Sequence, residues 1–203
     1  MSNPSTSSQR VETAFSGRFL ELVSWGTWEY ARRRGSSGVV GIVAVTDDRK
    51  LVLVEQFRIP VQACVIELPA GLAGDQARDE DLADAARREL LEETGYDAAR
   101  FTRLFVGPSS AGMTDECVVA YLAEGLKRVH AGGGDASEQI VVHEVSLSDL
   151  PEWLDAQARR GKLIDFKVWA APVLLAFAES HRGTLPSREP LHTDHPGSNE
   201  RSR

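Results

Sequence analysis

The chain has 203 residues, of which 42% are hydrophobic, and this is enough apolar material to bury one sizeable core. Its formal net charge of -7, from 23 basic and 30 acidic residues, gives no electrostatic reason to expect tight binding to nucleic acid or to an anionic membrane. Only two cysteines, Cys64 and Cys117, are present, and both lie in apolar stretches, so buried reduced thiols are expected rather than a disulfide framework. No apolar run is long enough to span a bilayer, and a cytoplasmic protein is expected.

The two ends of the chain differ in composition from its middle. Residues 1–10 and 187–203 are polar, rich in Ser, Pro, His and charge, and have no hydrophobic period, so both are expected to be disordered tails. Residues 11–36 are expected to form an N-terminal β lobe, because strand-like segments on both sides of Gly26 predict a hairpin. Residues 37–186 then form the main domain.

Short apolar segments predict a series of strands in the main domain. They lie at residues 39–45, 51–57, 64–68, 101–106, 118–122 and 140–147. Helical spacing replaces this pattern at residues 79–94, 150–160 and 165–181, with Asp79 as the expected N-cap of the first helix and Gly95 at its end. Pro172 should kink the last helix or mark a late start. This order of elements predicts an α/β (α+β) fold, in which helices cover both faces of a mixed sheet.

The first predicted helix carries an unusual group of acids. Glu89, Glu92 and Glu93 are spaced i, i+3 and i+4, which places three carboxylates on one side of the helix. Two of them adjoin the apolar stripe of the helix, where a counter-charge is needed, and carboxylate oxygens suit Mg2+ or Mn2+. The alternative is a solvated face whose charge is offset by Arg87 and Arg88.

A longer pattern decides between these two explanations. Gly74 is followed after five residues by Glu80, and after seven more by the run Arg88-Glu89-Leu90-Leu91-Glu92-Glu93-Thr94-Gly95-Tyr96. This pattern resembles the complete Nudix box. The resemblance implies the Nudix fold, with a mixed sheet between helices and a small N-terminal antiparallel β lobe, and it implies a pyrophosphohydrolase. Measured from Gly71 the box is three residues too long, so residues 72–74 or a nearby stretch are expected to be a loop insertion.

The resemblance extends upstream of the box, toward the ADP-ribose pyrophosphatase branch of the superfamily. The segments Val54-Glu55-Gln56-Phe57-Arg58 and Glu67-Leu68-Pro69-Ala70-Gly71 are similar to the strand and loop that precede the box in that branch. There the Arg helps to hold the phosphates of the substrate. The resemblance therefore implies that Arg58 and Glu67 bind substrate, and the planar fork of an Arg suits phosphate oxygens. The alternative for Arg58 is a surface cation beside Glu55.

The same branch holds its metals with box carboxylates and with the carbonyl of the residue before the loop glycine. Carried over to this chain, the implied ligands of Mg2+, or of Mn2+ as a substitute, are Glu89, Glu93 and the backbone of Ala70. Glu92 would be a bridging or supporting ligand. Arg88, at i+4 from Glu92, would steady the carboxylates rather than touch the substrate.

Two further residues have counterparts in this branch. Trp28, in Gly26-Thr27-Trp28-Glu29, resembles the aromatic that stacks on adenine; the alternative is that it packs the hairpin onto the main sheet. The N-terminal strands of the branch also form a dimer contact, which implies a homodimer. Glu138 matches the position of a loop Glu that acts as general base or extra metal ligand, with Asp135 in reserve. The alternative is a solvated acid in a mobile loop.

The implied activity is Mg2+-dependent hydrolysis of a nucleoside diphosphate sugar, with ADP-ribose giving AMP and ribose 5-phosphate as the leading case. Residues 108–116 (PSSAGMTDE) are loosely similar to the Pro-containing loop downstream of the box in sugar-nucleotide hydrolases. One alternative is GDP-mannose or another sugar nucleotide as substrate. Another is a non-catalytic Nudix module that senses a nucleotide, for which a broken box would be expected.

Overall fold

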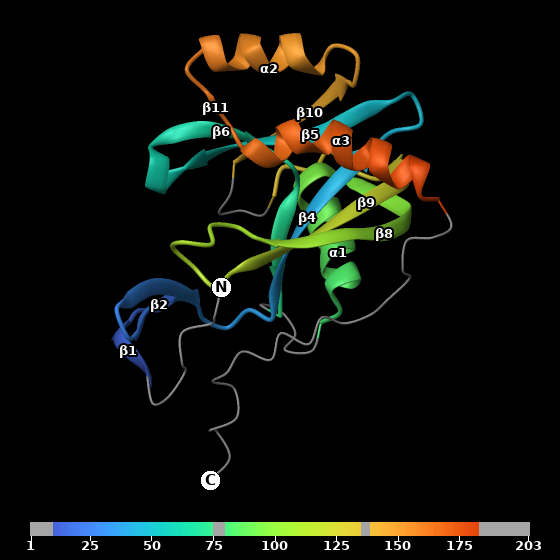
Figure 1. Ribbon diagram of the computed structural model, residues 1–203. Coiled ribbons are helices and arrows are strands. Elements are labelled where there is room, and N and C mark those ends of the chain that lie inside the picture. Colours follow the sequence, from blue (N-terminus) through green and yellow to red (C-terminus); the bar gives the residue numbers. More distant parts are fainter. Residues whose placement is uncertain (1–9, 75–79, 135–138, 183–203) are drawn as a thin grey trace.

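The computed structural model describes residues 10–74, 80–134 and 139–182. Within these residues the chain forms a small three-stranded sheet and a larger eight-stranded mixed sheet, together with three α-helices (Figure 1). The predicted mixed sheet with helices and the small antiparallel lobe are therefore confirmed. The predicted tails lie outside the described residues, except for Arg10.

The N-terminal lobe consists of β1 (Val11–Ser16), β2 (Leu20–Trp25) and β3 (Trp28–Arg33). Strands β2 and β3 form the predicted hairpin, and the turn between them contains Gly26, whose φ of 63° lies in the left-handed region that favours glycine. Strand β1 pairs with β2 but was not predicted, because all of its side chains are exposed and show no alternation. In Figure 1 the lobe lies to one side of the main sheet.

The larger sheet has the strand order β11-β6-β5-β4-β9-β8, with β10 paired to β5 and β7 paired to β4. Its strands are β4 (Gly38–Val45), β5 (Lys50–Arg58), β6 (Ala63–Glu67), β7 (Ala70–Ala73), β8 (Tyr96–Pro108), β9 (Cys117–Arg128), β10 (Ile140–Ser146) and β11 (Leu163–Ile164). A short 3-10 helix, η1 (Ile59–Val61), connects β5 to β6. The pairs β4–β9 and β6–β11 are parallel and the other pairs are antiparallel.

Strand β7 corrects one expectation. Leu72 and Ala73, which we expected in a loop insertion, pair with Val39 and Gly38 of β4. The short sequence Ala-Gly-Leu-Ala contains one glycine, is followed by another and has no strand pattern of its own, so its pairing with β4 determines its conformation.

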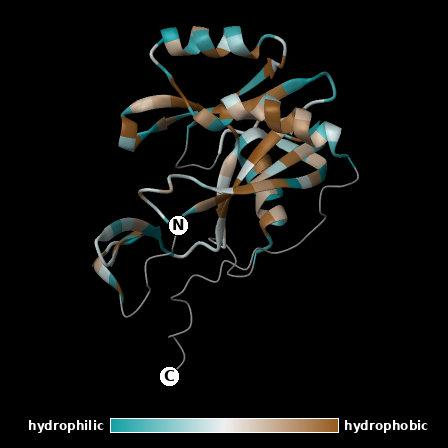
Figure 2. Cartoon of the chain, in the orientation of Figure 1, coloured by the Kyte–Doolittle hydropathy of each residue, from teal (hydrophilic) through white to brown (hydrophobic). Residues whose placement is uncertain are grey.

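The helices cover both faces of the sheet. Helix α1 (Leu82–Thr94) packs on one face, and α2 (Leu150–Arg159) and α3 (Phe166–Ser180) pack on the other (Figure 1). The side chains of β4 alternate between the two resulting cores: Ile42 packs with residues of α1, and Val43 packs with residues of α2 and α3. This burial on both faces explains the apolar sequence of β4, which Figure 2 shows as a hydrophobic band.

Two helix boundaries differ from those predicted. The N-cap of α1 is Asp81, whose side chain accepts a hydrogen bond from the Ala83 amide at 2.8 Å, whereas Asp79 lies outside the described residues. Helix α3 begins at Phe166 and contains Pro172, so a late start at the proline is wrong. None of the helices in the described part of the chain combines the length and hydrophobicity that a membrane span requires.

Candidate active site

Helix α1 presents its acids beside β7 because its apolar side is fixed against the sheet. Ala86 and Leu90 are fully buried in the core that α1 shares with β4 and β5. The helix ends at Gly95, which adopts a left-handed φ of 74° and donates its amide to the carbonyl of Leu91 at 2.8 Å. The acids of the last two turns therefore have a defined position at the edge of the core.

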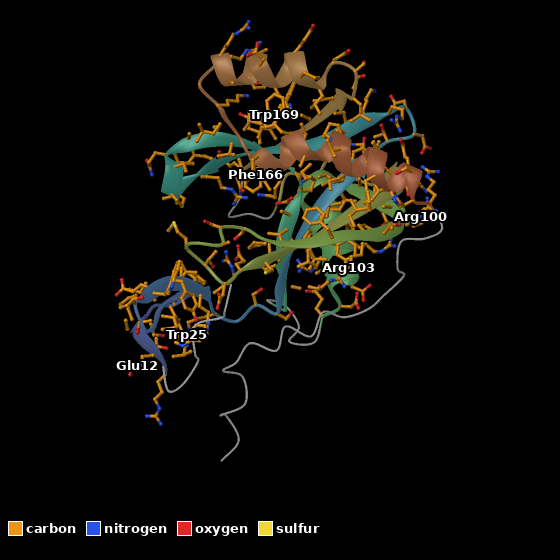
Figure 3. The ribbon with its side chains drawn as sticks, in the orientation of Figure 1. Glu12, Trp25, Arg100, Arg103, Phe166 and Trp169 are labelled. Carbon is orange, nitrogen blue, oxygen red and sulfur yellow. The ribbon has the colours of Figure 1, made fainter. Side chains whose placement is uncertain are left out.

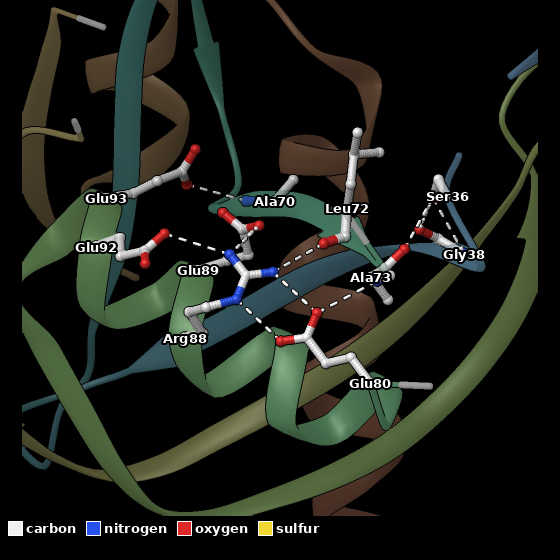
Figure 4. Close-up of polar contacts among 11 residues, drawn as sticks. Ser36, Gly38, Ala70, Leu72, Ala73, Glu80, Arg88, Glu89, Glu92 and Glu93 are labelled. Atoms are coloured by element: carbon white, nitrogen blue, oxygen red, sulfur yellow. Dashed lines mark hydrogen bonds and ion pairs between the residues drawn. The ribbon is translucent and has the colours of Figure 1, made fainter. Parts of the chain in front are cut away.

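Arg88 lies at the centre of a polar cluster (Figure 4). Its Nε and Nη2 donate to the two carboxylate oxygens of Glu80 at 2.9 and 3.1 Å. Its Nη1 donates to Glu89 at 2.8 Å and to Glu92 at 3.3 Å, and Nη2 also donates to the carbonyl of Leu72 at 2.9 Å. These contacts connect α1 to β7 and to the residue that precedes the N-cap.

The surroundings of Arg88 favour the charged form of its guanidinium. The hydrogen bonds to Glu80 raise the pKa of the Arg88 guanidinium above its ordinary value, although partial burial opposes the shift, and the charge of Glu89 raises it further. The arginine thus offsets part of the repulsion among the box carboxylates. Its contacts with Glu89 and Glu92 are those expected of a residue that steadies the carboxylates.

Glu89 and Glu93 both lie against the first residues of β7. Glu93 is only 6% exposed, and its carboxylate accepts a hydrogen bond from the Ala70 amide at 3.1 Å. A Cβ atom on Gly71 would come within 1.9 Å of the Glu89 carboxyl carbon, so glycine is required for this approach. The structure therefore brings together the three residues that the sequence implied as metal ligands, Ala70, Glu89 and Glu93.

The donor set at this point fits a hard cation with open coordination positions. Among the described residues, no group of three or more His, Cys, Asp or Glu side chains is arranged to hold a metal ion by itself. Glu89 and Glu93 instead flank a strand backbone, and Glu92 is 48% exposed at the rim. Mg2+ is usually bound through one or two carboxylates and the phosphates of its substrate while it keeps several waters, so the carboxylates of Glu89 and Glu93 would suit it.

Arg58 and Glu67, which were predicted separately, contact each other. Arg58 Nε donates to Glu67 at 2.7 Å across the β5–β6 hairpin. Glu55 accepts instead from His143 at 2.9 Å and from Lys162 at 2.7 Å, so the alternative in which Arg58 pairs with Glu55 is wrong. Glu67 orients the guanidinium at the point where β5 enters η1.

Of the remaining predicted residues, the structure describes Trp28 but not Glu138. Trp28 begins β3 and is 64% exposed, so it does not pack the hairpin onto the main sheet. Glu138 and its reserve, Asp135, lie outside the described residues.

Sequence reasoning missed the backbone groups that hold this site. Besides Gly71, these are the glycines that cap the end of α1. Gly133 donates its amide to the Glu93 carbonyl at 2.8 Å, and Gly134 donates to the Glu92 carbonyl at 3.1 Å. The only signal in the sequence is the run of three glycines at residues 132–134, a composition that is also typical of a flexible loop. The φ angles of these residues are 74° for Gly132, 116° for Gly133 and 75° for Gly134. Positive φ angles of this kind favour glycine, so the backbone at the end of α1 explains why three glycines occur there.

Comparison with known proteins identifies the family. The family model described as NUDIX domain matches residues 36–166. The chain belongs to the Nudix family. It is a Nudix hydrolase, and the residues of the box are those that meet at α1 and β7 in Figure 4.

The relatives of this Nudix hydrolase include sugar-nucleotide pyrophosphatases. The chain is 35% identical to an ADP-ribose pyrophosphatase of Bacillus subtilis over 145 residues, which are 68% of this chain and 77% of that protein. It is 33% identical to a methanol dehydrogenase activator of Bacillus methanolicus over 152 residues, 71% of this chain and 80% of that protein. A GDP-mannose pyrophosphatase of Escherichia coli is 30% identical over 140 residues, 64% of this chain and 71% of that protein.

A solved structure supports the fold. The crystal structure of an ADP compounds hydrolase superposes with a TM-score of 0.66 and 21% sequence identity, and it covers 86% of this chain and 94% of that chain. This likeness confirms the Nudix fold.

Proposed function

We propose that this Nudix hydrolase cleaves the pyrophosphate of a nucleoside diphosphate sugar in an Mg2+-dependent reaction, with ADP-ribose as substrate and AMP and ribose 5-phosphate as products. The observation that carries the proposal is the meeting of Glu89 and Glu93 with the backbone of Ala70 and Gly71. The sequence similarity to an ADP-ribose pyrophosphatase supports the choice of substrate.

Glu89, Glu93 and the Ala70 carbonyl would hold the metal, with Glu92 as a bridging or supporting ligand and Mn2+ as a substitute ion. A divalent ion bound there neutralises pyrophosphate charge and lowers the pKa of a bound water. Arg88 keeps the carboxylates in place through its five hydrogen bonds to Glu80, Glu89, Glu92 and Leu72.

The substrate contacts come from other elements. Arg58, oriented by Glu67, offers its guanidinium to the phosphates. Trp28 offers an exposed indole to the base. Glu138 would either receive the proton of the attacking water as a general base or serve as an additional metal ligand.

A homodimer is part of the proposal, and a cytoplasmic location stays a prediction from the sequence. The lobe exposes several large apolar side chains, and a second copy of the chain would cover them. The second candidate activity is the same hydrolysis with GDP-mannose, which is favoured by the similarity to a GDP-mannose pyrophosphatase. A module that only senses nucleotide is disfavoured, because the box residues are all present and assembled.

The test is a substrate panel assayed with Mg2+: ADP-ribose, GDP-mannose, ADP-glucose, NADH and diadenosine polyphosphates. ADP-ribose is expected to have the highest kcat/KM. Glu93→Gln should lower kcat by about 100-fold or more while the fold is kept, since it removes a ligand charge at nearly constant shape. Glu152→Gln, an exposed carboxylate on α2, is the matched control and should keep the parent rate.

One result would contradict the choice of substrate, and another would contradict the metal site. Faster hydrolysis of GDP-mannose would overturn the substrate while the site stands. A Glu93→Gln variant within a few-fold of the parent at saturating Mg2+ would overturn the metal site.

A further inference from the structure

The N-terminal lobe contacts the main domain through residues 109–116, the loop between β8 and β9. The amide of Ala31 donates to the carbonyl of Met113 at 2.8 Å. Ala31 also forms a parallel β-bridge with Thr114. Strand β3 of the lobe therefore gains a backbone partner far away in the sequence.

Two ion pairs flank this backbone contact. Arg32 Nε donates to Asp115 at 2.8 Å, and Arg33 Nε donates to Glu116 at 2.7 Å. Consecutive residues of a strand point to opposite faces, so the two arginines hold β3 from both sides. Partial burial disfavours the charge of Arg32, but the hydrogen bond to Asp115 and nearby charges outweigh this and raise its pKa.

The loop that receives these contacts is internally braced. The amides of Met113 and Thr114 donate to the Ser110 carbonyl at 2.9 and 3.1 Å. The Ser109 amide donates to the Glu116 carbonyl at 3.0 Å, next to the last pair of the β8–β9 ladder. A contact at the loop tip is thus connected to the main sheet through hydrogen-bonded backbone.

Trp28 lies on the same face of β3 as Arg32, the residue that binds Asp115 of the loop. The register of β3 against β2 runs without a bulge, so Trp28, Tyr30 and Arg32 share one face. Arg32 Nη2 donates to the Tyr30 hydroxyl at 2.9 Å, in agreement with this placement. Both Trp28 and Met113, on the two sides of the contact, keep about two thirds of their surface in solvent, at 64% and 68%.

We propose that residues 31–33 and 113–116 form a latch that fixes Trp28 relative to the main domain and so presets the site for the nucleobase. This inference rests on the proposed function. Arg32 and Asp115 are positioning residues: they act through β3 and the loop, and in the described part of the chain their hydrogen bonds join them to each other and to Tyr30. A preset site spares the substrate the cost of ordering it, so the latch lowers KM and leaves kcat unchanged.

The experiment exchanges the charges of one pair. Arg32→Asp and Asp115→Arg are each expected to raise KM for ADP-ribose by about tenfold, with kcat within about twofold of the parent. The double variant, which restores an ion pair of opposite polarity, should recover most of the parent KM. Arg159→Asp, which breaks an exposed ion pair with Asp155 on α2, is the matched control and should leave KM unchanged.

A milder pair keeps the test decisive if a reversed charge impairs folding. Arg32→Lys and Asp115→Asn keep the side-chain size nearly constant, and quenching of tryptophan fluorescence by AMP measures base binding without turnover. Weaker AMP binding is expected for both, at an unchanged thermal midpoint of unfolding.

Single variants with the parent KM, or a double variant whose KM is no closer to the parent value than that of the single variants, overturn the latch. A parent inactive on every sugar nucleotide overturns the proposed function and the latch's substrate role together, whereas an active parent with unchanged variants overturns the latch alone.

Discussion

Glu80 precedes α1 and accepts hydrogen bonds from Arg88 and from the Gly74 amide. The hydrogen bonds from Arg88 are the main reason that the pKa of Glu80 lies below its ordinary value of 4.5; burial opposes this shift, and the Gly74 amide and the charge of Arg88 add to it. A carboxylate whose pKa is lowered by folding stabilises the fold above pH 4.5. That contribution is lost as the pH falls through the folded-state pKa.

Glu80→Gln is therefore expected to lower the free energy of unfolding by about 1–2 kcal/mol at pH 7, because it weakens charge-assisted hydrogen bonds to a mostly buried guanidinium. The difference from the parent should shrink as the pH falls below 4.5, where the carboxylate of the unfolded parent binds a proton, and should be lost once the pH has fallen through the lowered pKa of the folded state. Urea unfolding at pH 7, 5.5 and 4 measures this. Glu12→Gln, at an exposed site on the lobe (Figure 3), is the control, and a gap that stays constant to pH 4 and below would contradict the assignment.

Among single residues, the sequence predicted the acids of the box and their support by Arg88, but not the contacts with Gly71 and Leu72. Glu89 and Glu93 follow from helical spacing, which is local. The contact of Glu89 with Gly71 and the hydrogen bond from Arg88 to Leu72 join segments that are 16 or more residues apart. Such contacts depend on where β7 docks on β4, and no local pattern encodes that.

At the scale of elements, the strands with strong apolar spacing were predicted, whereas β1, β7 and β11 were not and β8 was predicted only in part. β4 and β5 are buried on both faces or nearly so, and their runs of Val, Ile and Leu show this in the sequence. β8 begins at Tyr96, five residues before the predicted start, because its polar first half pairs with the end of β9. The two-residue β11 exists only through its parallel pairing with β6.

The glycine segment 132–134 caps α1, so a substitution in it is predicted to displace the end of that helix. Gly132 has a left-handed φ of 74°, and a Cβ there would lie 2.4 Å from the backbone carbon of Thr94. Gly132→Ala should displace the cap, lower the free energy of unfolding by roughly 2 kcal/mol or more, and reduce kcat, since Glu92 and Glu93 lie in the capped turn. Gly161→Ala is a matched control.

The control separates backbone strain from displacement of the site. Gly161 also has a left-handed φ, 84°, but a Cβ there would meet nothing within 4 Å, and it follows α2 rather than α1. Gly161→Ala should cost about 1 kcal/mol of stability and leave kcat unchanged. Equal loss of activity in the two variants, measured at a temperature where both are folded, would show that the cap does not position the carboxylates.

On the scale of the whole molecule, the described residues leave several large apolar side chains in solvent, and two of the surfaces that they form are candidate interfaces. One is on the lobe and includes Phe15 and Phe19, which are 65% and 63% exposed. The other follows the outer side of α3, where Phe166 and Trp169 project from the helix (Figure 3) and Val173 is 70% exposed. A helix that is apolar on its outer side as well as its inner side is unusual in a monomer, so either surface is a candidate interface.

We expect the lobe to form the contact between two copies of the chain, and this expectation distinguishes the two surfaces. The double variant Phe15→Glu, Phe19→Glu should convert a dimer to a monomer, because charges placed in an apolar interface lose hydration without gaining a partner. Val173→Glu on α3 has the same change of charge at a similarly exposed site and should leave the dimer intact. Light scattering coupled to size-exclusion chromatography gives the mass of each variant over a range of concentrations.

Two results would contradict this expectation. If Val173→Glu yields the monomer and the lobe variant stays dimeric, α3 is the interface. If the parent itself is monomeric at every concentration, the lobe acts within one chain and Trp28 can serve only the site of its own domain.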